Sequence, residues 1–74
     1  MDKLTLLKKF GKNVKIERIR KDLTQEQLAE RMDVSQKYIS GIEGGKANMS
    51  LAKILELAQF LETDIENLLQ FKDQ

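Results

Sequence analysis

The sequence predicts a compact all-α domain of five helices, and three observations lead to that fold class. The 74 residues include no proline, apolar residues recur at helical spacing, and Ser or Thr precedes three of the apolar segments. No segment alternates apolar and polar residues over the length of a strand. We therefore expect a single domain over residues 1–74, with helices at residues 3–21, 25–32, 36–43, 51–61 and 65–71.

The first two helices follow from periodicity and from one capping signal. Leu7, Phe10 and Val14 lie on one face of the first helix at spacings of three and four residues. The second helix begins after Thr24, which is followed three residues later by Gln27. This spacing is typical of a capping box, in which each side chain bonds the backbone amide of the other residue.

The remaining helices have similar starts. Ser35 precedes the third helix and Ser50 precedes the fourth, and each such cap contributes about 1 kcal/mol. The fifth helix begins at Thr63 or Asp64. Only residues 33–35 separate the second and third helices, a spacing found both in DNA-binding helix-turn-helix motifs and in simple helical hairpins. The spacing alone leaves both interpretations open.

The composition argues against catalysis. The chain has neither cysteine nor histidine, so the usual general base, the thiol nucleophile and the commonest metal ligands are missing. No pair of acids lies among apolar residues in a way that favours raised pKa values, so a carboxylate enzyme has no supporting pattern. We expect a binding protein without catalytic residues, cofactor or metal.

Charge and hydropathy indicate the surroundings of the protein. Apolar residues make up 41% and charged residues 34%, and no apolar segment approaches the ~18 residues of a membrane span. With no signal-peptide pattern we expect a cytoplasmic protein that does not bind membranes. Residues 1–46 carry a net charge of +4 and residues 47–74 a net charge of −3. This split favours one face for phosphates, although a solvated face of Lys8, Lys9, Lys12 and Lys15 produces the same count.

A specific resemblance covers nearly the whole chain. Residues 23–29 (LTQEQLA) and 34–40 (VSQKYIS), followed by Ile42-Glu43 and Gly45-Lys46, resemble the xenobiotic-response-element family, which includes the Cro and lambda-type repressors. Residues 38–43 (YISGIE), with Asn48 and Ser50-Leu51 after them, look most like restriction–modification controller proteins. The resemblance implies a lambda-repressor-like fold with its helix-turn-helix at about residues 24–43. It also implies a transcriptional regulator that binds double-stranded DNA with its third helix in the major groove.

Four residues of the third helix are candidates for base contacts: Gln36, Lys37, Ser40 and Gly41. At 100° per residue they lie within an arc of about 140°, opposite the packing side of the helix. Gln36 suits adenine, Lys37 suits guanine and Ser40 suits several base edges. Alternatively, Lys37 meets a phosphate and Ser40 bonds the Gln36 carbonyl. Gly41 either allows close approach to DNA or is a change that packing tolerates.

The resemblance also assigns phosphate contacts and one ion pair. The phosphate candidates are Gln25, Ser35, Tyr38, Lys46 and Asn48. Tyr38 could instead be partly core, and Asn48 could only shape its loop. In this family, residues at the positions of Arg18 and Glu43 form a largely buried ion pair. The sequence departs from the family pattern at Asp33 and Glu62, where glycine is usual.

The C-terminal third is expected to join two copies. Residues 61–72 carry more apolar residues than two short helices need, and we assign Ile65, Leu68 and Phe71 to a homodimer contact. The alternative is that these residues close the core of one copy. No effector domain follows residue 71, so no small-molecule effector is expected. A rival function is a helical protein-interaction module, such as an antitoxin or a bridging domain.

Overall fold

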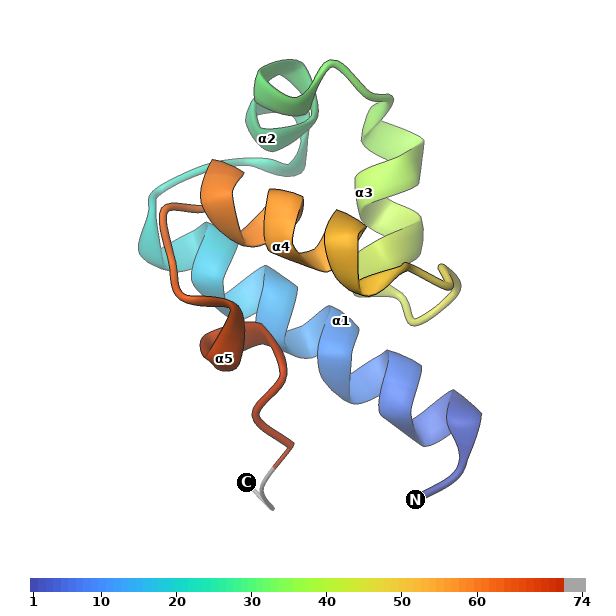
Figure 1. The fold of residues 1–74 in the computed structure, drawn as a ribbon. Helices are drawn as coiled ribbons and strands as arrows, with labels where there is room; N and C mark the ends of the chain where they lie inside the picture. The colour runs from blue at the N-terminus through green and yellow to red at the C-terminus, as the bar shows by residue number, and fades with distance from the viewer. Residues whose placement is uncertain (72–74) are drawn as a thin grey trace.

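The computed structural model describes residues 1–71, and these residues form five α-helices and no strand (Figure 1). The helices are α1 (Lys3–Arg20), α2 (Gln25–Met32), α3 (Gln36–Glu43), α4 (Leu51–Phe60) and α5 (Ile65–Leu68). The long α1 runs beneath α3 and α4, α5 packs against α1, and a short turn joins α2 to α3. The predicted all-α, five-helix fold class is confirmed.

The predicted end of the last helix is wrong. The helix was expected to reach residue 71, but α5 ends at Leu68. Asn13 on α1 accounts for this, because its Nδ2 donates to the carbonyl oxygens of Leu68 at 3.0 Å and Gln70 at 2.9 Å. These carbonyls bond a side chain from α1 rather than amides further along a helix. The other predicted ends, for α1 and α4, lie one residue beyond those observed.

Three predicted caps are confirmed. The Thr24 hydroxyl accepts from the Gln27 amide at 3.0 Å, and Gln27 Oε1 accepts from the Thr24 amide at 2.9 Å. Ser35 and Ser50 each accept a hydrogen bond at 3.1 Å from the amide three residues later. The start of α5 is different, since Asp64 makes no side-chain capping bond.

A fourth cap was not anticipated. Asp2 stands before α1 and its carboxylate accepts from the Thr5 amide at 2.8 Å. This hydrogen bond to the backbone lowers the pKa of Asp2. An aspartate directly before a helix is itself a capping signal, so the sequence contained the information.

The core lies where the five helices meet, and α1 approaches the end of α3 very closely at Gly11. A Cβ at residue 11 would lie 2.5 Å from the Glu43 carbonyl oxygen and still nearer to that of Ile42. None of the helices within residues 1–71 is both long and apolar enough to cross a membrane. The buried apolar side chains are Phe10, Val14, Leu23, Leu28, Ala29, Ile39, Ile42, Ile54, Leu57, Ala58, Leu61 and Leu68.

Three helices end in a left-handed residue that is not glycine. Asp33 after α2 has a φ of 55° and Glu62 after α4 has a φ of 53°, so both positions have the backbone that favours glycine. Asp22 after α1 has a φ of 56° and was not singled out from the sequence. Aspartate tolerates this conformation better than glutamate does, because its short side chain can bond locally.

Candidate nucleic-acid interface

Helix α3 presents one polar, exposed face and one buried face. Gln36, Lys37 and Ser40 are exposed, whereas Ile39 and Ile42 are fully buried. The Ser35 cap fixes the start of α3 and the packing of its two isoleucines fixes its rotation. The structure therefore brings the candidate base-contact residues together on one surface.

Gly41 lies on the same face and touches nothing that requires a glycine. A Cβ built at residue 41 would meet no other atom within 4 Å, and the φ of this residue is not in the left-handed region. Glycine inside a helix costs about 1 kcal/mol relative to alanine. Neither packing nor backbone conformation within residues 1–71 compensates for that cost.

Arg18 and Glu43 form the ion pair that the resemblance implied. Arg18 Nε donates to Glu43 Oε2 at 2.7 Å, and Arg18 Nη2 donates to Glu43 Oε1 at 3.1 Å. The side chains are only 10% and 4% exposed. A third bond, from Arg18 Nη1 to the Leu23 carbonyl at 2.6 Å, ties the pair to the start of the motif. The end of α3 is thus joined to α1 by a buried two-pronged contact.

Two glutamines extend this pair to the surface. Gln25 Nε2 donates to Glu43 Oε1 at 3.0 Å, and Gln36 Nε2 donates to Gln25 Oε1 at 2.6 Å. An unbroken row of side chains therefore runs from Arg18 in the interior to Gln36 on the exposed face. The sequence singled out both glutamines separately and missed their contact. Such a contact depends on how α2 and α3 cross, which no local pattern encodes.

The segment after α3 places two further polar residues beside this face. Lys46 and Asn48 are both exposed, and the Lys46 amide donates to the Gly41 carbonyl at 2.9 Å. Gly45 has a φ of 77°, and a Cβ there would lie 2.8 Å from Cγ of Lys8. This glycine lets the chain turn against α1 and hold Lys46 near the end of α3.

Ser35 and Tyr38 lie at the other end of α3. The Ser35 hydroxyl already accepts the Tyr38 amide as a cap. Tyr38 is 38% exposed and borders a hollow of about 350 Å³ that Met32, Val34 and Met49 also line. Its ring therefore lies at the rim of the core. This position fits both roles that the sequence left open, a phosphate contact and a place partly in the core.

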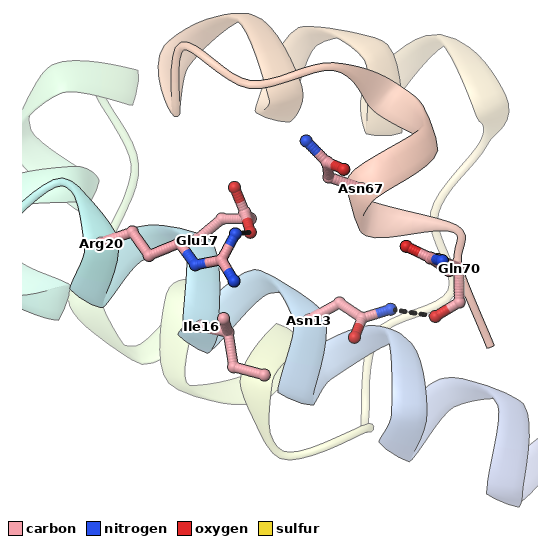
Figure 2. Close-up of a pocket in the computed structure, with 6 residues that line it drawn as sticks. All are labelled: Asn13, Ile16, Glu17, Arg20, Asn67 and Gln70. Carbon is pink, nitrogen blue, oxygen red and sulfur yellow. Dashed lines mark hydrogen bonds and ion pairs between the residues drawn. The ribbon is translucent and has the colours of Figure 1, made fainter. Parts of the chain in front are cut away.

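A second polar cluster lies on the C-terminal half of α1, and its role is structural. Figure 2 shows Asn13, Glu17 and Arg20 facing Asn67 and Gln70 around a hollow of about 120 Å³. The Glu17 carboxylate accepts from Arg20 Nη1 at 3.2 Å and from the Thr63 hydroxyl at 2.8 Å. Among the residues described, no buried side-chain nitrogen or oxygen lacks a hydrogen-bond partner. The cluster fastens the C-terminal segment to α1.

One of the three residues assigned to a dimer contact is misplaced. Leu68 is 0% exposed and belongs to the core of its own chain, so it is not on a surface that a second copy can touch. The Leu68 carbonyl accepts from Asn13, which fastens this part of the chain to α1. Ile65 and Phe71 are half-buried and pack against the same core.

Four exposed leucines lie on α4 and at the start of α1, whereas Ile19, which is 54% exposed, lies near the other end of α1. Leu51 and Leu55 are 70% and 47% exposed on α4, and Leu4 and Leu6 are 58% and 38% exposed on α1. Leu51 and Leu6 border a largely apolar hollow of about 260 Å³, to which Phe71 also contributes. We call Leu6, Leu51 and this hollow the leucine surface.

Comparison with known proteins gives a family match and several relatives. A helix-turn-helix family model matches residues 14–68 of the chain. The control protein C.BamHI of Bacillus amyloliquefaciens is 38% identical over 63 residues, which are 84% of this chain and 78% of that protein. An HTH-type transcriptional regulator of Methanocaldococcus jannaschii is 38% identical over 52 residues, or 70% of this chain and 79% of that protein.

A solved structure shows the same arrangement of helices. The restriction-modification controller protein C.AhdI from Aeromonas hydrophila superposes with a TM-score of 0.76 at 39% identity. The match covers 84% of this chain and 94% of that one. These relatives are regulators and controllers rather than enzymes, in agreement with the prediction from composition.

Proposed function

The chain belongs to the helix-turn-helix family, and from that premise we propose that it controls transcription as a homodimer bound to a palindromic operator. DNA binding and transcription regulation follow from the family and from its regulator and controller relatives. The proposal adds the residues that contact DNA, the surface that joins two copies, and a cytoplasmic place of action.

The exposed face of α3 is the observation that carries the proposal. Gln36, Lys37 and Ser40 offer hydrogen-bonding groups that match base edges in the major groove. Gly41, on the same face, lets the backbone of α3 approach the bases. This reading gives the glycine a role that nothing inside the protein supplies.

The residues around this face suit the DNA backbone. Gln25 stands at the start of α2, where free amides and the helix dipole favour anions. Lys46 and Asn48 follow the end of α3, and Ser35 and Tyr38 flank its start. Contacts on both sides of α3 would fix its position along the groove while the α3 side chains select the sequence.

Two copies are needed for useful specificity, because one reading helix contacts only a few base pairs. We assign the contact between copies to the leucine surface, with the half-buried Phe71 at its edge. Exposed leucines beside an apolar hollow suit a two-fold contact, in which a side chain of each copy enters the hollow of the other. The leucines lie on α1 and α4 and the hollow is also lined by residues 47–49, so the contact would leave the exposed face of α3 available to DNA.

Selection of bound duplexes from a random pool tests the proposal. We expect enrichment of an inverted repeat with half-sites about 34 Å apart, or a multiple of that helical turn, and binding that weakens with salt. An unenriched pool would contradict sequence-specific binding. Stable association with a protein partner, together with no enriched duplex, would favour the interaction-module alternative.

A further inference from the structure

Glu43 does more than hold α3 in place, because of the kind of bonds its oxygens make. Both carboxylate oxygens accept hydrogen bonds from Arg18, and Oε1 also accepts from Gln25 at 3.0 Å. A carboxylate in this arrangement can only accept, so the group of Gln25 that faces it must be the NH₂. The opposite orientation would place two acceptor oxygens against each other in a largely buried position.

The orientation of Gln25 then determines that of Gln36. With its NH₂ directed to Glu43, Gln25 presents its carbonyl oxygen to Gln36, which donates to it at 2.6 Å. Gln36 must therefore also use its NH₂ for the internal bond. One N–H and the carbonyl oxygen of Gln36 make no bond within residues 1–71. Gln25 likewise retains one N–H, which can serve a phosphate oxygen.

We infer that Glu43, without reaching the DNA, sets the orientation of the Gln36 amide and thereby makes the protein select adenine over guanine. The inference rests on the proposed role of Gln36 as a base reader. Adenine presents a donor at N6 beside an acceptor at N7, which matches the remaining oxygen and N–H of Gln36. Guanine presents two acceptors, O6 and N7, so the Gln36 oxygen would face O6 without a proton between them.

A glutamine without this chain of bonds would discriminate less. Its amide can turn over and direct both hydrogens toward guanine, at no cost to an internal partner. Glu43 is thus a positioning residue for specificity, in addition to its part in the ion pair. Its predicted effect is on the ratio of affinities for two duplexes, which a merely structural role would leave unchanged.

The test starts from duplexes that the wild-type protein selects from a random pool. The base position whose preference changes in Gln36→Ala is identified, and its A·T pair is replaced by G·C. The adenine-to-guanine affinity ratio is then measured by titration for the wild type, Gln25→Met and the double variant Arg18→Met/Glu43→Met. Gln25→Met keeps the buried ion pair, and the double variant keeps Gln25. The exposed Gln59 on α4 supplies a matched control, Gln59→Met.

We expect the wild type and Gln59→Met to prefer adenine by roughly fivefold to 150-fold. Gln25→Met and the double variant should lose most of this preference, even where both duplexes bind more weakly. If the double variant does not fold, Gln25→Met decides the matter. A wild-type preference for guanine, or an unchanged ratio in Gln25→Met or in the folded double variant, would overturn the inference while leaving Gln36 as a reader. Unaltered selectivity in Gln36→Ala would instead overturn the proposed reader itself.

Discussion

Gly11 on α1 packs directly against the backbone of Glu43 at the end of α3, with room for a hydrogen and not for a methyl group. A Cβ at residue 11 would lie 2.5 Å from the Glu43 carbonyl oxygen. The nearest atoms, the carbonyl oxygens of Ile42 and Glu43, belong to the backbone, so the clash cannot be relieved by rotating a side chain. The distance between α1 and the reading helix is therefore set by a residue that no sequence motif marked.

Alanine at residue 11 should therefore destabilise the protein. We expect Gly11→Ala to cost about 1–3 kcal/mol through overpacking, despite the better helix propensity of alanine. Gly41→Ala is the matched control, because the new Cβ meets nothing within 4 Å; it should stabilise the fold by about 1 kcal/mol. Urea unfolding of both variants measures the contrast. DNA titration of Gly41→Ala adds a second result, because unchanged affinity would contradict close approach of α3 at this residue.

The buried ion pair should show strong coupling. Removing Arg18 or Glu43 alone should destabilise the protein by about 3–5 kcal/mol, since each would leave its partner buried without compensation. Replacing both by methionine should cost less than either single change. Thermal unfolding of the three variants measures this coupling. Two small and additive effects would mean that the pair is solvated in solution.

Base reading and phosphate binding should separate in two variants. Gln36→Ala should relax the preference at one base position, at a cost of about 1–3 kcal/mol for the preferred base. Lys46→Ala should weaken binding to all duplexes alike and reduce the salt slope by about one unit. Titration of several duplexes at several salt concentrations distinguishes the two. A base-specific effect of Lys46→Ala would contradict its assignment to phosphate.

A charge on the leucine surface should separate the two copies. Leu51 is 70% exposed, so Leu51→Lys should leave the folded chain intact while preventing an apolar contact between copies. Gln59→Lys, also exposed on α4, is the control and should remain dimeric. Sedimentation across a concentration series measures both. The dimer model fails if the wild type sediments as a monomer and binds one half-site as tightly as the full palindrome.

The left-handed residue after α4 offers a stabilising change. Glu62 has a φ of 53°, and Glu62→Gly should gain up to about 1 kcal/mol by relieving this conformation. The side chain lost is 72% exposed and lies 3.8 Å from Arg31, a surface pair of little value. Asp33→Gly should gain less, because aspartate tolerates the same backbone better. Equal thermal shifts in the two variants would argue against this explanation.

How far the sequence predicts the structure depends on the range of each interaction. The starts of α2, α3 and α4 were predicted correctly because a cap is formed by residues three positions apart, as at Thr24 and Gln27. The end of α5 was not, because it depends on Asn13, which lies 55 residues from Leu68 in the chain. Leu68 was wrongly assigned to a surface for the same reason, because its burial depends on the packing of α5 against the distant α1.

In the candidate site, too, local features could be predicted from the sequence and contacts between helices could not. The exposed residues of α3 could be chosen from helical periodicity, which identifies the face of a helix. The bond between Gln25 and Gln36 could not, because it requires two helices to cross at one particular angle. The exposure of Leu51 could not be predicted either, since helical spacing alone does not show which end of a short helix a neighbour covers.

The hydrogen bonds between α1 and the C-terminal segment also affect when the protein can fold during its synthesis. Asn13 and Glu17 are synthesised early, yet their partners, Leu68, Gln70 and Thr63, are added roughly fifty residues later. Until then, the side-chain amide of Asn13 lacks both of its acceptors, and Glu17 has Arg20 but not Thr63 as a donor. The contacts of α3 with α1 need no residue beyond Glu43, but the hydrogen bonds of the C-terminal segment to α1 are completed only after residue 70 has left the exit tunnel. The domain should therefore complete its fold as one cooperative unit once residue 70 has emerged, and not helix by helix.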